Sequence, residues 1–229
     1  MKELIVIATP HARFDPVEAE LRALGGFEVV RFREPHELTH EALAPLAPRW
    51  VFFPHWSWKI PPDIHENFEC VIFHMTDVPF GRGGSPLQNL IVRGFEATKL
   101  TALRCVEEMD AGPVYLQRDL SLLGTAEEIL LRASAVIGGM IKEIALQRPA
   151  PVPQSGEPTI FKRRKPADGD LGKAGTLEEA HDLVRMLDAD GYPRAFADIG
   201  PFRIEFSRSS LRRGEILADA RISIRSTDP

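Results

Sequence analysis

The chain has 229 residues, of which 44% are hydrophobic and 27% charged, so it is long enough for one full core and a smaller attached unit. Its net charge of −5 argues against a nucleic-acid partner, because phosphate binding normally requires a basic face. The first apolar run, residues 4–8, is too short for a signal peptide or a membrane span, and we expect a cytoplasmic protein without membrane contact. Cys70 and Cys105 lie in apolar runs, which indicates buried reduced thiols.

The first half of the chain alternates apolar runs with amphipathic segments. Residues 4–8 are rich in β-branched side chains, as in a strand that is buried on both faces. Asp15-Pro16 and Gly25-Gly26 mark the start and the stop of a helix. Further strands are predicted at 27–32, 50–53 and 70–73, and helical segments at 36–46 and from 61. This alternation predicts an α/β fold with a doubly wound, mostly parallel, Rossmann-like sheet and helices on both faces.

The second half contains a proline-rich break. We expect a helix at 86–94, strands at 99–106 and 114–122, and a long helix at 125–146. Several prolines follow within residues 148–158, where regular elements are disfavoured. We therefore divide the chain into a main domain (1–147), a linker (148–158) and a small C-terminal α+β or β subdomain (159–229). In the latter we expect a helix at 177–187 and strands at 195–206 and 215–224.

Two separated motifs contain the side chains suited to chemistry. His74 follows a buried strand and precedes a glycine-rich turn around Arg82, and residues 106–113 read Val-Glu-Glu-Met-Asp-Ala-Gly-Pro, with the aspartate at position 110. Over residues 1–145 this pattern resembles the folate-dependent formyltransferase family, which includes the methionyl-tRNA, glycinamide-ribotide and nucleotide-sugar enzymes. Each motif alone is weak evidence, whereas both together, in this order and spacing, are specific.

The resemblance implies a transfer of the formyl group from 10-formyltetrahydrofolate to the primary amine of a small molecule, with His74 and Asp110 as catalytic residues. A neutral histidine at a strand end can donate to a developing oxyanion or shuttle a proton, and an adjacent aspartate can orient it and accept charge. The structural alternatives are a hydrogen-bonded histidine at the sheet edge and a turn aspartate before Gly112.

One position departs from the family pattern. The family has an asparagine two residues before the histidine, where it acts as an oxyanion donor, and this chain has Ile72. An aliphatic side chain cannot donate a hydrogen bond, and the loss of one such donor typically costs about a hundredfold or more in rate. Local substitutes are Ser57, Trp56, Thr76 or a backbone amide in the turn 80–84.

The remaining predicted site residues fall into two groups. Aromatic side chains after the third strand suit a folate or base pocket, although they equally suit the core. Arg82 suits a phosphate or carboxylate, or else a solvent-facing turn. The expected co-substrate contacts are Trp56, Val106, Glu107, Glu108, Met109 and Gly112, and the expected substrate contacts are Ser57, Thr76, Arg82 and Gly83; no metal is expected.

Several functions remain open at this level. We expect an acceptor that is a nucleotide-linked amino sugar, because the C-terminal region is short and the chain is acidic. The alternatives are methionyl-tRNA, an amino acid or a hydroxylamine as acceptor, and a folate- or nucleotide-binding homologue that Ile72 has weakened as a catalyst. A homodimer is also open.

Overall fold

The computed structural model describes residues 2–225. The chain folds into two compact units. The first consists of Met1–Gly83, Thr98–Leu120 and Leu131–Ile160, and the second of Gly84–Ala97, Ser121–Leu130 and Phe161–Pro229. Among the described residues, no helix is long and apolar enough to cross a membrane, and no group of three or more His, Cys, Asp or Glu side chains could hold a metal ion.

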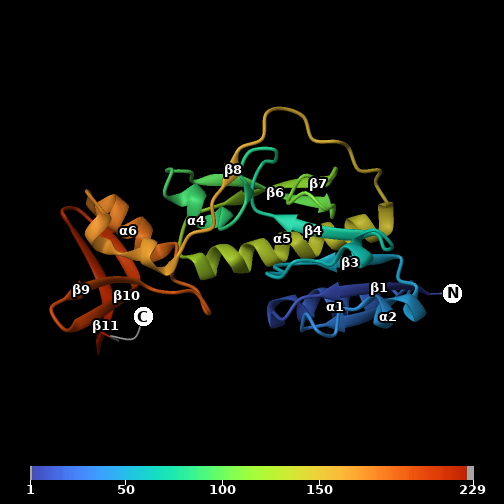
Figure 1. The fold of residues 1–229 in the computed structure, drawn as a ribbon, viewed down its shortest axis with the longest axis horizontal. Helices are drawn as coiled ribbons and strands as arrows, with labels where there is room; N and C mark the ends of the chain where they lie inside the picture. The colour runs from blue at the N-terminus through green and yellow to red at the C-terminus, as the bar shows by residue number, and fades with distance from the viewer. Residues whose placement is uncertain (1, 226–229) are drawn as a thin grey trace. The chain divides into compact units, whose positions relative to one another are not determined.

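A six-stranded sheet in the order β2-β1-β3-β4-β6-β7 forms the centre of the first unit (Figure 1). The strands β1, β2, β3 and β4 are parallel, and β6 is antiparallel to β4. The strands are β1 (Glu3–Ala8), β2 (Phe27–Phe32), β3 (Trp50–Phe53), β4 (Cys70–His74), β6 (Ala97–Arg104) and β7 (Val114–Ser121), and the helices are α1 (Asp15–Ala23), α2 (His40–Leu43), α3 (Pro62–His65) and α5 (Ala126–Gln147). Short 3-10 turns lie at Ala12–Phe14 and Ala44–Leu46.

Helices cover both faces of this sheet. On one face, Val6 of β1 and Val51 of β3 share a buried cluster with Leu43 of α2 and Ile64 of α3. Helix α5 packs against α1, since a Cβ atom added to Gly138 would lie 2.6 Å from Val17 Cγ2. The prediction of a doubly wound, mostly parallel sheet is therefore confirmed.

The helix predicted for residues 36–46 starts later than expected. Helix α2 begins at His40 because the Thr39 side chain accepts a hydrogen bond from the amide of Ala42 at 3.2 Å and caps the first turn. Residues 44–46, which include Pro45, continue as a 3-10 turn. The prediction was wrong for residues 36–39.

The second unit contains a three-stranded antiparallel sheet in the order β11-β10-β9 and is an α+β unit. Helix α6 (Leu177–Arg185) is capped by Thr176 and packs against β10. The other elements are α4 (Pro86–Ile91), β9 (Ala195–Ile199), β10 (Phe202–Arg212), β11 (Glu215–Ile224) and 3-10 turns at Pro166–Gly169 and Leu171–Lys173. Two short strands, β5 (Arg82–Gly83) and β8 (Ile160–Phe161), form a separate ribbon.

Candidate active site

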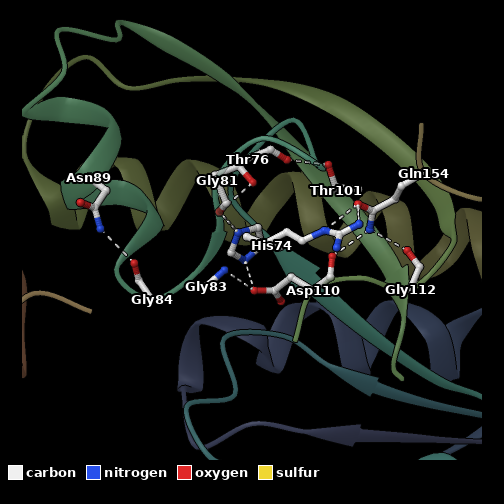
Figure 2. Close-up of polar contacts among 11 residues, drawn as sticks. His74, Thr76, Gly81, Gly83, Gly84, Asn89, Thr101, Asp110, Gly112 and Gln154 are labelled. Atoms are coloured by element: carbon white, nitrogen blue, oxygen red, sulfur yellow. Dashed lines mark hydrogen bonds and ion pairs between the residues drawn. The ribbon is translucent and has the colours of Figure 1, made fainter. Parts of the chain in front are cut away.

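His74 is the last residue of β4, and its ring is held on both sides (Figure 2). The ring nitrogen Nε2 donates to the carbonyl oxygen of Gly81 at 2.7 Å, and Nδ1 lies 3.5 Å from Oδ2 of Asp110. The two side chains are 8% and 11% exposed. Because a carbonyl oxygen can only accept, Nε2 must carry a proton, and Nδ1 is the nitrogen left to face the carboxylate.

A chain of hydroxyl groups supports the Gly81 carbonyl. Thr76 is fully buried, and its hydroxyl donates to Gly81 O at 3.3 Å. The backbone carbonyl of Thr76 in turn accepts from the Thr101 hydroxyl on β6 at 2.7 Å. Figure 2 shows this chain running from β6 to the His74 ring. Thr76, predicted as a substrate contact, lies at the site with its hydroxyl engaged by Gly81.

Asp110 reaches His74 from the loop between β6 and β7. Since β6 is antiparallel to β4, Thr101 pairs with His74 and Arg104 pairs with Val71 near the start of β4. The loop after Arg104 therefore has to run back toward His74. Its residue Asp110 has a positive φ of 54°, a conformation that aspartate tolerates better than most residues, and its Oδ2 accepts from the amide of Gly83 at 2.8 Å.

A second set of hydrogen bonds fixes this loop. Arg82 donates to Oε1 of Gln154 at 3.1 and 2.8 Å and to Glu108 at 3.2 Å. Gln154 donates through Nε2 to the backbone carbonyls of Asp110 and Gly112, both at 2.8 Å. Gly112 has no room for a side chain, because an added Cβ would lie 1.8 Å from the carbonyl oxygen of Arg104. The guanidinium of Arg82 is thus held by the protein, and the Arg82 side chain is only 12% exposed.

The structure brings some predicted residues together and leaves others apart. Gly83 contacts Asp110 directly, and Glu108 contacts Arg82. Val106 is partly buried, whereas Glu107, Glu108 and Met109 are exposed in the same loop, Met109 by 69%. Ser57 is exposed in the loop after β3, and no contact joins it to His74 among the described residues.

The face of the sheet that holds Ile72 also holds Trp56. Both side chains pack against the cluster around Val51, and Phe53, the register partner of Ile72 on β3, makes an edge contact with Trp56 at 6.0 Å between ring centroids. The indole Nε1 of Trp56 is buried and has no hydrogen-bond partner in residues 2–225. Several of the donors expected to replace the asparagine are already bonded: the Thr76 hydroxyl donates to Gly81, and the amides of Phe80, Gly83 and Gly84 each have a partner. The indole N–H of Trp56 has none among the described residues.

Sequence reasoning missed Gln154, which links Arg82 to the loop of Asp110. It lies in the stretch predicted as a linker, and that stretch is part of the first unit. Val152 exchanges two backbone hydrogen bonds with Val114, at 2.7 and 2.8 Å, and the amide of Thr159 donates to Pro79 O. The sequence holds no signal for this role of Gln154, because a lone glutamine among prolines reads as solvated chain.

Comparison with known proteins places this arrangement among formyltransferases. A sequence model of the methionyl-tRNA formyltransferase C-terminal domain matches residues 166–223. The solved structure titled "Methionyl-tRNA formyltransferase from Clostridium thermocellum" is 45% identical, with a TM-score of 0.94, over 97% of this chain and 100% of that one. A methionyl-tRNA formyltransferase of Thermodesulfovibrio yellowstonii is 26% identical over 75% of this chain and 58% of its own length.

A more distant likeness concerns the fold alone. The formyltransferase PseJ from Anoxybacillus kamchatkensis, solved with UDP-4,6-dideoxy-4-formamido-L-AltNAc and tetrahydrofolate, is 15% identical with a TM-score of 0.56, over 69% of this chain and 85% of that one. This chain therefore shares its fold with that formyltransferase. On the 45% identity over the full length of the Clostridium thermocellum protein, the chain belongs to the formyltransferase family. It spans 58% of the length of the curated relative named above.

Proposed function

We propose that this protein is an N-formyltransferase that moves the formyl group of 10-formyltetrahydrofolate to a primary amine. The observation that carries the proposal is the buried pair of His74 and Asp110 at the end of β4, with Nδ1 and Oδ2 3.5 Å apart, in a member of the formyltransferase family. The separation exceeds the usual N–H···O hydrogen-bond distance, so the two atoms are not locked in a hydrogen bond to each other, and both can interact with a reacting group beside them.

The pair can carry out the proton transfers of the reaction. The amine nitrogen attacks the formyl carbon, the carbonyl oxygen becomes an oxyanion, and the carbon–nitrogen bond to the folate breaks as the oxyanion collapses. Asp110 accepts the proton that the amine loses, and the Nδ1–H of protonated His74 supplies the proton that the departing folate nitrogen gains. Transfer of the proton from Asp110 to Nδ1 then restores the starting state, while Nε2 stays bonded to Gly81.

For the oxyanion, we propose the Trp56 indole as the donor in place of the family asparagine. Its N–H is buried without a partner among the described residues, and its ring packs against the same cluster as Ile72. A buried donor without a partner is costly unless a ligand satisfies it. The 10-formyltetrahydrofolate would lie along the loop 106–109 and Gly112, where the exposed Met109 offers an apolar contact.

Trp56→Phe tests the oxyanion donor, because it removes the N–H and keeps an aromatic ring. Trp50→Phe is the matched control, since the Trp50 indole nitrogen is also buried without a partner in residues 2–225 but belongs to β3. We expect Trp56→Phe to lower kcat by roughly 10²–10³-fold, the usual cost of one oxyanion donor, and Trp50→Phe to leave it unchanged. Equal rates in the two variants would exclude the indole as the donor.

For the acceptor, we propose a nucleotide-linked amino sugar. Six arginines of the second unit pair with carboxylates within that unit, which reduces the positive charge that they offer to a nucleic acid. These pairs are Arg185–Asp182, Arg194–Asp188, Arg203–Asp198, Arg208–Asp219, Arg221–Glu205 and Arg225–Asp198. The net charge of −5 points the same way, and PseJ, which shares the fold, was solved with a nucleotide-linked formamido sugar.

Methionyl-tRNA is the second candidate acceptor, favoured by the names of the relatives in Clostridium thermocellum and Thermodesulfovibrio yellowstonii. Release of tetrahydrofolate from 10-formyltetrahydrofolate, measured with nucleotide amino sugars and with methionyl-tRNA, separates the two. A tRNA substrate should also show a steep fall in apparent affinity with salt, because bound phosphates release counterions. Inactivity of the wild type with every amine would contradict the transferase proposal.

A further inference from the structure

A second group of polar side chains lies at the carboxyl ends of β1 and β3. Strand β1 pairs with β2 on one side and with β3 on the other, so the strand order reverses between β1 and β3. In open α/β sheets, ligands bind beyond the strand ends at this point of reversal. The residues that follow these strands are His11 and Arg13 after β1, and His55 after β3.

These three side chains converge. The rings of His11 and His55 lie 6.1 Å apart at an interplanar angle of 80°, and Nη2 of Arg13 lies 3.4 Å from Nδ1 of His11. Phe14 packs its ring edge-on against His55 at 5.4 Å and forms an apolar wall. All three polar residues are partly exposed.

Two nitrogen atoms in this group lack partners. Nη1 of Arg13 and Nε2 of His55 are shielded from solvent and form no hydrogen bond within residues 2–225. Arg13 also makes no ion pair in that range, although two carboxylates lie nearby in the sequence. Asp15 and Glu18 are both engaged by Arg31, at 3.5 and 3.6 Å. The arginine charge is thus uncompensated by the described part of the protein.

The backbone at His55 adopts a strained conformation. Its φ is +51°, in the left-handed region that few non-glycine residues adopt. Such conformations persist where the surrounding structure holds them, and they cluster at functional sites. Burial, together with the charges of Arg13 and His11, lowers the pKa of His55 to about 3, which keeps the ring neutral beside the arginine at pH 7.

We propose that Arg13 and His55 form a binding site for a phosphate group, and that this phosphate belongs to the nucleotide-linked acceptor. The identity of the molecule that carries the phosphate rests on the proposed function. A phosphate offers several acceptor oxygens in different directions, which suits donors arriving from two separate loops. The arginine fork matches phosphate geometry and supplies the missing opposite charge. Neither nearby acidic side chain competes, because Asp15 and Glu18 bind Arg31.

Isothermal titration of inorganic pyrophosphate into the protein, without folate or acceptor, tests the site separately from formyl transfer. We expect Arg13→Gln to weaken pyrophosphate binding about 10- to 100-fold, the loss of one hydrogen bond to a charged group. His55→Asn should also weaken binding, since asparagine tolerates the positive φ but lacks the ring. The matched control is Arg213→Gln, an exposed arginine in the turn between β10 and β11, which should bind as the wild type does.

Thermal melting supplies an independent readout. Arg13→Gln should melt at or above the wild-type temperature without ligand, because it removes an unpaired, partly buried charge, whereas the loss of an arginine with a structural role would lower it. Pyrophosphate should raise the melting temperature of the wild type and not that of Arg13→Gln. No binding to the wild type, equal binding to Arg13→Gln and Arg213→Gln, or a lowered melting temperature of Arg13→Gln would each overturn the site. Pyrophosphate binding without formyl transfer would keep the phosphate site and reject the transferase.

Discussion

Replacing Asp110 with asparagine removes one negative charge beside His74 and leaves the shape of the side chain unchanged. Asparagine tolerates the positive φ of 54° at this position, and its side-chain oxygen can still accept the Gly83 amide that now lies 2.8 Å from Oδ2. The contact of Gln154 is with the backbone carbonyl of residue 110 and is also retained. The fold of the loop should therefore survive the substitution.

The proton chemistry should not survive it. An amide cannot accept the proton of the attacking amine, and it leaves the Nδ1 of His74, 3.5 Å away, without an opposite charge. The lost contact of Nδ1 with a carboxylate lies at 3.5 Å, beyond the usual hydrogen-bond distance, so it contributes less than the roughly 1.5–3 kcal/mol of a hydrogen bond to a charged group. Loss of a general base typically costs about 10²–10⁴-fold. We expect kcat to fall within that larger range while KM for the folate stays near the wild-type value.

The assay is tetrahydrofolate release at saturating 10-formyltetrahydrofolate, with the acceptor that the wild type uses. Asp77→Asn is the matched control, because it makes the same charge change three residues after His74, where the carboxylate accepts from Gln117 at 2.8 Å. An Asp110→Asn protein that turns over as fast as Asp77→Asn would refute the reasoning. Thermal melting of both variants checks that neither has lost its fold.

Two further predictions concern stability. Gly112→Ala should lower the free energy of unfolding by about 1–3 kcal/mol or more, because the new Cβ would overlap the Arg104 carbonyl oxygen. Gly139→Ala should raise it by about 0.5–1 kcal/mol, because Gly139 lies in helix α5 with open space around it. Urea denaturation measures both values, and the opposite ranking of the two variants would contradict the prediction. Burial, and then the charge of Arg13, lowers the pKa of His55 to about 3, so below pH 6.5 the unfolded chain binds the proton that the folded chain excludes. The contribution of His55 to the free energy of unfolding is therefore fully present above pH 6.5, and it falls by at most about 1.4 kcal/mol per pH unit as the pH drops toward 3. His55→Asn should make the free energy of unfolding depend less on pH in this range than it does in the wild type.

The sequence predicted the sheet well because its strands are short apolar runs between clear breakers. Residues 50–53 form β3 without any shift in boundary, and the predicted helix 125–146 matches α5 within one residue at each end. The start of α2 was missed because the Thr39 cap depends on a hydroxyl that can also face solvent. A periodic apolar pattern predicts where a helix or strand lies. It does not predict whether a threonine hydroxyl caps a helix or bonds another nearby backbone group, because both hydrogen bonds are local and similar.

The sequence predicted the two motifs of the site, but not the hydrogen bonds that connect them. The order of the motifs indicated that His74 and Asp110 work together, but their contact depends on the loop after Arg104 running back along β4. That path is held by Gln154, whose position depends on the backbone pairing of residue 152 with residue 114. Contacts of this kind leave no local pattern in the sequence, because the two residues that form each contact are tens of positions apart.

The two sets of polar groups differ in how far the protein satisfies them, and this difference bears on how substrate would be held. At His74, the imidazole, the Thr76 hydroxyl and Arg82 all have partners, so a substrate gains little there unless it displaces an existing contact. At Arg13, a buried donor has no partner among the described residues, and a ligand that satisfies it replaces nothing. Binding free energy is therefore available away from the reacting atoms. It can be used to hold the amine beside His74 and Asp110, where the stabilisation is needed only in the transition state.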